Sequence, residues 1–100
     1  MDENQIKNIF KPYRTRIDAL DQQIIDLLRA RYDVIEEVAD LKIQHNIDAV
    51  LQDRVDEVRE NAATMAAKQG LDEDFIRKLY AQLIEHSCNL EDKIKNDRAA

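Results

Sequence analysis

Residues 12–45 read PYRTRIDALDQQIIDLLRARYDVIEEVADLKIQH and contain no glycine, and no proline after Pro12. Two rows with a seven-residue spacing run through this stretch, and most of their members are apolar, which is typical of a helix that packs against other helices. The rows are Ile17, Ile24, Arg31, Val38 and His45, and then Leu20, Leu27, Val34 and Leu41. At about 1.5 Å per residue the helix would be about 50 Å long, against a radius of gyration of about 13 Å for a domain of this size. We therefore expect a second copy of the chain to cover the excess length.

The rest of the sequence predicts two further helices, and hence an all-α chain with three helices and a long first helix. Asp48 is expected to cap the second helix and Gly70 to end it, because these residue types favour the N-terminal and C-terminal positions of helices. Asp72 is expected to cap the third helix. The predicted inner faces are Leu51, Val55, Val58, Ala62 and Met65, and then Phe75, Ile76, Leu79, Leu83, Leu90 and Ile94.

Length and composition indicate one domain, residues 1–100, with residues 1–11 and 96–100 expected to be flexible. Pro12 is expected at an early position of the long helix, where its missing N–H does no harm, or else the helix extends upstream of Pro12 with a kink. The net charge of −6 argues against binding to nucleic acid or to an anionic membrane surface. No apolar run approaches the ~20 residues of a membrane span, and the N-terminus has no signal-peptide pattern.

The one cysteine, Cys88, allows no internal disulfide, which fits a reducing cytosol and predicts a cytoplasmic protein. The sequence has no Cys and His cluster with metal-ligand spacing and no Gly-rich phosphate loop. We therefore expect no metal and no cofactor.

Arg31 is the anomaly of the long helix, because it occupies an apolar row. A buried guanidinium is costly unless an anion meets it. Lys42 lies eleven residues later, about three turns and roughly 16 Å along the axis, so it faces nearly the same way. These two cations on one inward face predict a site for a small polyanion.

Polar groups also interrupt the other two apolar faces, namely Arg54 in the second helix and Ser87 and Glu91 in the third. Taken singly, each has an ordinary explanation: Arg54 can pair with Glu57, Ser87 can lie at a tight helix crossing, and Glu91 can pair with Lys95. Likewise, a lone Arg31 can pair with a neighbouring acid, and Lys42 can extend to solvent. Their joint occurrence favours a pocket for a dianion.

Arg14 lies 17 residues before Arg31, roughly 25 Å along the helix. No arginine side chain spans that gap. If Arg14 serves the same ligand, it does so in the other chain, with the long helices antiparallel across a two-fold axis. The alternative is a solvated Arg14 that pairs with Asp18.

These residues resemble a known family. The chain contains RTRIDALD with Arg14 first, LLRAR with Arg31, then Lys42, DR with Arg54, GLD, and IEHS with Ser87. In this order and spacing, over about residues 10–95, they are similar to the all-helical (AroQ-class) chorismate mutases. The resemblance implies an intertwined, antiparallel homodimer with two equivalent sites, and the [3,3] rearrangement of chorismate to prephenate without a nucleophile, metal or cofactor.

The resemblance also implies a role for each site residue. Arg14 of the partner and Arg31 would bind the two carboxylates of the substrate, and Lys42 would reach the ether oxygen and a carboxylate. Arg54 would add positive field, and Ser87 would donate to a carboxylate. Catalysis then consists of holding the flexible dicarboxylate in a compact geometry and stabilising charge on the breaking ether bond.

The sequence departs from many relatives at Glu91, where they have a glutamine whose NH₂ group donates to the ether oxygen. A carboxylate cannot donate a hydrogen bond, whereas a carboxylic acid can. Our hypothesis is that Glu91 works in its protonated form. The rate should then fall on the alkaline side, where Glu91 loses its proton.

A second departure is at Leu51 and Val55, where some relatives have acidic residues that bind the ring hydroxyl. Gln52 or the backbone would then have to bind that hydroxyl. The identity of the substrate is therefore open between chorismate, isochorismate and 4-amino-4-deoxychorismate. Isochorismate would be the substrate of an isochorismate-pyruvate lyase, an enzyme that the run LYAQLIEH also resembles. A non-catalytic helical dimerisation or regulatory module is the alternative from another class.

Overall fold

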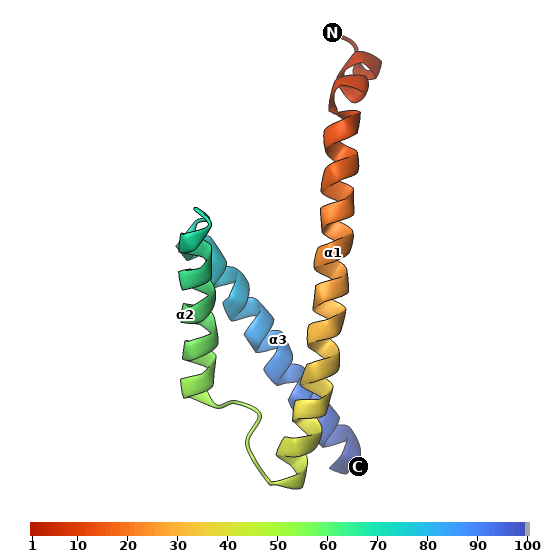
Figure 1. The fold of residues 1–100 in the computed structure, drawn as a ribbon. Coiled ribbons are helices and arrows are strands. Elements are labelled where there is room, and N and C mark those ends of the chain that lie inside the picture. The colour runs from red at the N-terminus through yellow and green to blue at the C-terminus, as the bar shows by residue number, and fades with distance from the viewer. Residues whose placement is uncertain (100) are drawn as a thin grey trace. The chain divides into compact units, whose positions relative to one another are not determined.

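The computed structural model describes residues 1–99 and is helical throughout, with no strand in this part of the chain (Figure 1). Helix α1 spans Glu3–Gln44, α2 spans Gln52–Lys68 and α3 spans Glu73–Ala99. The all-α class and the three helices are thus confirmed. None of the described helices is both long enough and apolar enough to span a membrane.

The chain forms two compact units, Met1–Asp33 and Val34–Ala100, and α1 runs through the boundary between them. Helix α1 begins at Glu3, so Pro12 lies inside the helix, and of the two predicted alternatives the upstream extension is confirmed. The helix begins early because Asp2 and Gln5 form a reciprocal cap. The Gln5 N–H donates to Asp2 Oδ1 at 2.8 Å, and the Asp2 N–H donates to Gln5 Oε1 at 2.9 Å.

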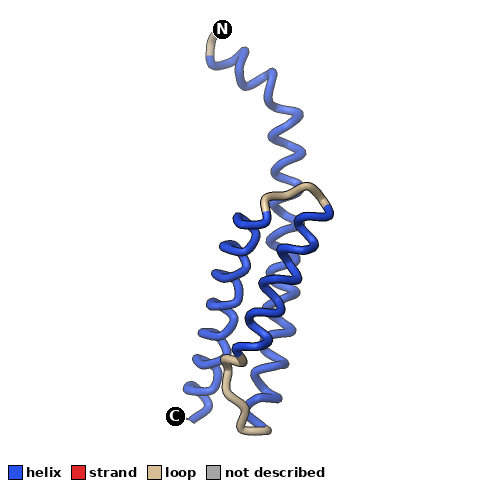
Figure 2. The backbone as a smooth tube through the Cα atoms, turned by 90° about the vertical axis from the view of Figure 1, so that its left-hand side faces the viewer, coloured by secondary structure: helices blue, strands red, loops and turns tan. Residues whose placement is uncertain are grey.

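Residues 3–11 are therefore helical, and the flexibility predicted for residues 1–11 stays a prediction. The two views show a bend in the N-terminal part of α1 (Figures 1 and 2). A proline inside a helix removes one backbone hydrogen bond and is a usual cause of such bends, and Pro12 is the proline of this helix. At the other end of the chain, α3 includes residues 96–99, and Ala100 lies outside the described residues.

The apolar rows of the Met1–Asp33 unit are exposed. Ile17, Leu20, Ile24 and Leu27 each have more than half of their surface accessible. The same holds for Val34 and Leu41, which continue the second row in the Val34–Ala100 unit. Six large apolar residues in register on one helix thus lack a covering surface within the chain.

The connection between α1 and α2 differs from the prediction at Asp48. Helix α1 ends with Asn46 in the left-handed region (φ 54°), and the Ile47 N–H donates to the Lys42 carbonyl at 2.8 Å. The N-cap of α2 is Leu51, whose side chain makes no capping bond, so Asp48 does not cap the helix. The chain at Ala49 is instead held against α1, since its carbonyl accepts from Lys42 Nζ at 2.8 Å, and the helix begins only after Leu51.

The turn between α2 and α3 confirms both of its predicted punctuation residues. Gly70 follows the C-terminus of α2 with φ 71°, a conformation that L-residues adopt only at a cost, and the Leu71 N–H donates to the Ala66 carbonyl at 2.9 Å. Asp72 then caps α3, since its Oδ1 accepts from the Phe75 N–H at 3.1 Å. Helices α2 and α3 consequently run back along each other (Figure 1).

Small side chains dominate the core of the Val34–Ala100 unit. Its buried apolar residues are Ala39, Ala62, Ala63, Ala66 and Ile84. Alanine faces let helices approach closely, which explains how a short helix such as α2 packs with few large side chains. The predicted inner faces are only partly right: Ala62 is buried, but Met65, Phe75 and Leu79 are exposed.

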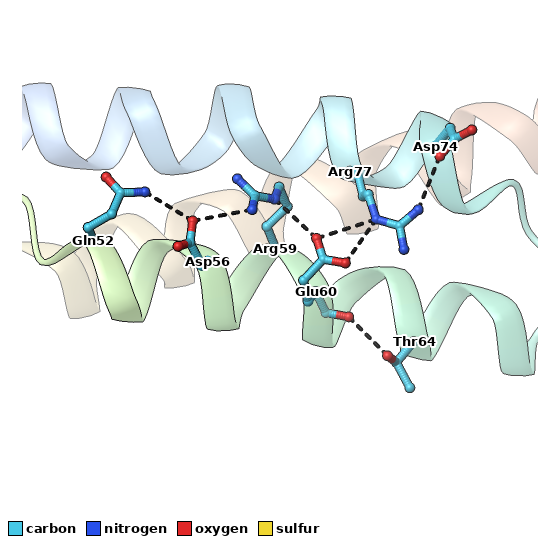
Figure 3. Close-up of polar contacts among 7 residues, drawn as sticks. All are labelled: Gln52, Asp56, Arg59, Glu60, Thr64, Asp74 and Arg77. Atoms are coloured by element: carbon cyan, nitrogen blue, oxygen red, sulfur yellow. Dashed lines mark hydrogen bonds and ion pairs between the residues drawn. The ribbon is translucent and has the colours of Figure 1, made fainter.

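A polar network joins the outer faces of α2 and α3 (Figure 3). Glu60 accepts from Arg59 of its own helix at 3.1 Å and from Arg77 of α3 at 3.0 Å, and Arg77 also pairs with Asp74 at 3.1 Å. The hydrogen bonds from Arg59 and Arg77 lower the pKa of Glu60. A lowered carboxyl pKa means that this contribution to stability is present at neutral pH and is lost as the pH falls through that pKa. The groups are exposed, so the contribution is modest.

The fully buried Ala63 provides a test of this core. Replacing Ala63, which is 0% exposed, with leucine should lower the free energy of unfolding by about 1–3 kcal/mol, because the added side chain has no space. The measurement is urea denaturation followed by circular dichroism. Ala67→Leu, on the exposed side of the same helix, is the matched control and should leave stability nearly unchanged. Equal stability of the two variants would contradict the packing described here.

Candidate active site

Two of the candidate residues, Lys42 near the end of α1 and Glu91 on α3, meet within the Val34–Ala100 unit. Lys42 Nζ lies 2.8 Å from Glu91 Oε1, and the two side chains are 17% and 6% exposed. A carboxylate buried to this degree requires a compensating charge. The prediction that Lys42 reaches solvent is therefore not what the structure shows, and neither is a pair between Glu91 and Lys95.

A backbone carbonyl in the α1–α2 connection also binds the Lys42 side chain. Its ammonium group donates to the Ala49 carbonyl in the α1–α2 connection at 2.8 Å. On the other side of this carbonyl, Cys88 Sγ of α3 lies at 3.9 Å. An ammonium group has three N–H donors, and only the one directed at the Ala49 carbonyl makes a hydrogen bond, so donors are left for a ligand.

Glu91 Oε1 is in contact with a charge but has no well-aligned hydrogen bond. The contact with Lys42 is short, yet its angles fall outside those of a hydrogen bond, and the oxygen is fully buried. Buried carboxyl oxygens are normally hydrogen-bonded. This oxygen therefore has unused capacity to accept a hydrogen bond or to carry a proton, and only the protonated form supplies the donor that the family resemblance places here.

Ser87 lies one turn before Glu91 on the same face of α3, and it is also buried. Its hydroxyl donates to the Leu83 carbonyl at 2.9 Å, as serine commonly does inside helices. A hydroxyl can rotate to another acceptor without moving the helix. Ser87 can thus donate to a carboxylate brought close to this face.

Lys42 and Glu91 line a small cavity together with Lys95. Its volume of about 10 Å³ is close to the room that one water molecule needs. The remaining lining residues are Ala39, Ile43, Ile47 and Ala49. A cyclic dicarboxylate does not fit this volume, so the ion pair between Lys42 and Glu91 must separate before such a ligand could bind here.

Two candidates in the first turn of α2 make local contacts on the helix surface. Arg54 pairs with Glu57, the alternative given by the sequence, and both side chains are more than half exposed. Gln52 donates to Asp56 Oδ1 at 3.0 Å. Exposed pairs of this kind exchange partners at little cost, so neither contact prevents these side chains from turning to a ligand.

Arg14 and Arg31 belong to the Met1–Asp33 unit. The Arg14 guanidinium lies over the Phe10 ring, 5.6 Å from its centroid, and makes no ion pair with Asp18 among the described residues. Arg31 is half-buried. Their roles in ligand binding stay predictions.

Two further groups at the site were not found from the sequence. The Ala49 carbonyl could not be found, because a backbone acceptor has no residue-type signal. Lys95 did have a signal, its i,i+4 spacing from Glu91, but it was considered only as a pairing partner. No group of three or more potential metal ligands occurs in the described residues 1–99.

Comparison with known proteins gives consistent matches. The chorismate mutase type II family matches residues 13–92. A 4-amino-4-deoxychorismate mutase from Streptomyces pristinaespiralis is 36% identical over 80 residues, which are 80% of this chain and 62% of that protein. A second protein of the same name, from Streptomyces venezuelae, is 35% identical over 88 residues, which are 88% of this chain and 85% of its own length. This chain therefore spans less than two thirds of the first relative. No solved structure matches significantly.

Proposed function

The chain belongs to the chorismate mutase type II family, and from this premise we propose that it catalyses the [3,3] rearrangement of chorismate to prephenate. The contact between Lys42 and the buried Glu91 supports the proposal most directly. The ammonium group of this pair has N–H donors to spare for an anionic ligand, and the Glu91 carboxyl can donate to an ether oxygen when it is protonated. Removing these two charges from water can cost more free energy than their attraction returns, so stability alone does not account for the pair.

The rearrangement requires position and charge rather than a nucleophile. The substrate must be held in a compact geometry, and negative charge that develops on the ether oxygen must be stabilised. We assign Lys42 to the ether oxygen and a carboxylate, and Ser87 to a carboxylate. Arg31, Arg54 and Gln52 complete the proposed contacts, with Arg14 supplied by a partner chain.

Glu91 changes its surroundings in this scheme. When Lys42 turns to the substrate, the buried carboxylate loses its nearest cation, and a buried group without a counter-charge favours its neutral form. The resulting carboxylic acid can donate to the ether oxygen. We therefore propose that Glu91 is protonated in the reactive complex.

This role predicts a pH-dependent rate. In the wild-type protein kcat should fall on the alkaline side as Glu91 loses its proton, and Glu91→Gln should remove that decline because an amide donates at any pH. Steady-state kinetics between pH 5 and 9 provide the measurement. An alkaline decline that persists in Glu91→Gln would show that another group is responsible.

We also propose that the active form is an intertwined homodimer. The exposed rows on α1, which include Ile17, Leu20, Ile24 and Leu27, form the kind of continuous apolar strip that a helix of a second copy covers. Arg14 lies at the start of this strip. In an antiparallel pair it would approach the partner's Lys42 and Glu91 rather than those of its own chain.

Mixing two inactive variants tests this arrangement. Arg14→Ala and Lys42→Ala should each lose most activity. Co-refolding them in equal amounts should restore about a quarter of the wild-type activity, because about half of the dimers are mixed and each mixed dimer has one intact site. If Arg14 served its own chain, no mixture would have an intact site, and activity would not return.

The same site favours a second candidate substrate, 4-amino-4-deoxychorismate. Both relatives named above are mutases of that compound. In addition, Leu51 and Val55 are apolar at the positions where some family members bind the ring hydroxyl with acids. Leucine and valine cannot accept a hydrogen bond from the ring hydroxyl, so these two positions do not favour chorismate over the amino compound.

Separate incubation with three compounds tests the function. Prephenate from chorismate supports the proposal, and faster formation of 4-amino-4-deoxyprephenate from 4-amino-4-deoxychorismate supports the second candidate. Salicylate and pyruvate from isochorismate would instead indicate a lyase. Turnover of none of the three would favour a non-catalytic helical module, and Lys42→Ala is the control for contaminating activity.

A further inference from the structure

We propose that Lys95 is a positioning residue that competes with the proton for the Glu91 carboxyl when Lys42 is engaged by the substrate, and so limits the pH range in which Glu91 can donate. The proposal rests on the function proposed above. Lys95 would join Lys42, Ser87 and Glu91 as a fourth functional side chain of the site. Lys95 would act through Glu91 and would not contact the reacting atoms.

The geometry that points to Lys95 is the small cavity beside the ion pair. Lys95 lines this cavity together with Lys42 and Glu91. It lies four residues after Glu91 on α3, the spacing at which side chains on one helix are neighbours. Glu91 is nevertheless paired with Lys42, and Lys95 makes no ion pair or hydrogen bond with the described residues.

The charges around Glu91 can be stated element by element. Helix α1 supplies Lys42, and α3 supplies Lys95. The α1–α2 connection supplies Ile47 and Ala49, which have no charged side chains, and α2 supplies none of the cavity lining. Asp40 of α1 and Arg98 of α3 form an ion pair of their own. Lys95 is therefore the second cation available to the Glu91 carboxyl.

Competition for Lys42 gives Lys95 its role. A dianionic substrate attracts the Lys42 ammonium and leaves the buried Glu91 carboxylate with two alternatives, a proton or another cation. A lysine has a flexible four-carbon chain and a compact charge, so Lys95 can reach a carboxylate one turn away. Glu91 held by Lys95 remains ionised and cannot donate to the ether oxygen.

It follows that Lys95 determines where activity declines at alkaline pH. A nearby cation favours the ionised form of a carboxyl group, so Lys95 makes the protonated, donating form of Glu91 less populated at a given pH. Without Lys95 this form persists to higher pH. Lys95 is exposed as a residue although it lines the cavity, and without an interaction with Glu91 it would leave the decline where it is.

The first experiment measures kcat against pH with the better of the two mutase substrates. Lys95→Gln should move the alkaline decline upward by about 0.2–0.4 pH unit, the effect expected when a cation one turn from a carboxyl is removed. Lys95→Arg retains the charge and should restore the wild-type profile. Lys93→Gln makes the same charge change at an exposed position of α3 outside the cavity, and should leave the profile unchanged.

The Glu91→Gln background separates this role from a general effect of charge. There, Lys95→Gln should not change the pH profile. An unshifted decline in Lys95→Gln, or a shift of equal size in the Glu91→Gln background, would overturn the proposal. Both outcomes are distinct from failure of the proposed function, in which the wild-type protein converts none of the substrates.

A second measurement requires no substrate and therefore tests Lys95 even in that case. In Lys42→Gln, which removes the competing cation, the Glu91 carboxyl can be titrated by carbon-13 NMR. Adding Lys95→Gln should raise the titration midpoint, because a nearby cation favours the ionised carboxyl, whereas adding Lys93→Gln should not. Identical midpoints in Lys42→Gln with and without Lys95→Gln would refute the contact.

Discussion

The ion pair between Lys42 and Glu91 is the constraint on which the Val34–Ala100 unit depends. It joins the last turns of α1 to α3, and both of its charges are largely removed from water. Breaking a buried pair by removing one partner is strongly destabilising, because the other charge stays buried. The unit therefore has to keep these two helices in contact, and the α1–α2 connection follows from that contact, since the Ala49 carbonyl binds the same ammonium group.

The rest of the unit is built to allow this contact. Alanines at the buried positions of α2 let it lie close to α3, and the Gly70 and Asp72 turn returns the chain along it. The polar network of Glu60 and Arg77 then joins the outer faces of the same two helices. Large apolar side chains are largely absent from this interior and lie instead at exposed positions. That distribution is the reverse of a self-sufficient domain and agrees with a chain whose core is completed by a second copy.

The sequence predicted those features that depend on local pattern. Seven-residue periodicity predicted the long helix, and Gly70 and Asp72 predicted the α2–α3 turn. Asp48 misled because a good capping residue was judged without the tertiary bond that Lys42 makes to Ala49. The start of α1 was left open between Pro12 and a position upstream of it, although Asp2 and Gln5 have the spacing of a reciprocal cap. At the site, the polar interruptions drew attention to Lys42 and Glu91, which the structure brings into contact. Spacing alone could not say that they would pair with each other rather than with a ligand or with Lys95.

The bond from Lys42 to Ala49 also limits which sequence changes the connection between α1 and α2 can accept during evolution. The acceptor is a main-chain oxygen, so almost any residue at position 49 supplies it. Point substitutions in this loop should therefore accumulate without displacing the ammonium group, whereas an insertion or deletion would carry the oxygen out of reach. Length, rather than residue identity, is the property of this loop that selection would be expected to preserve.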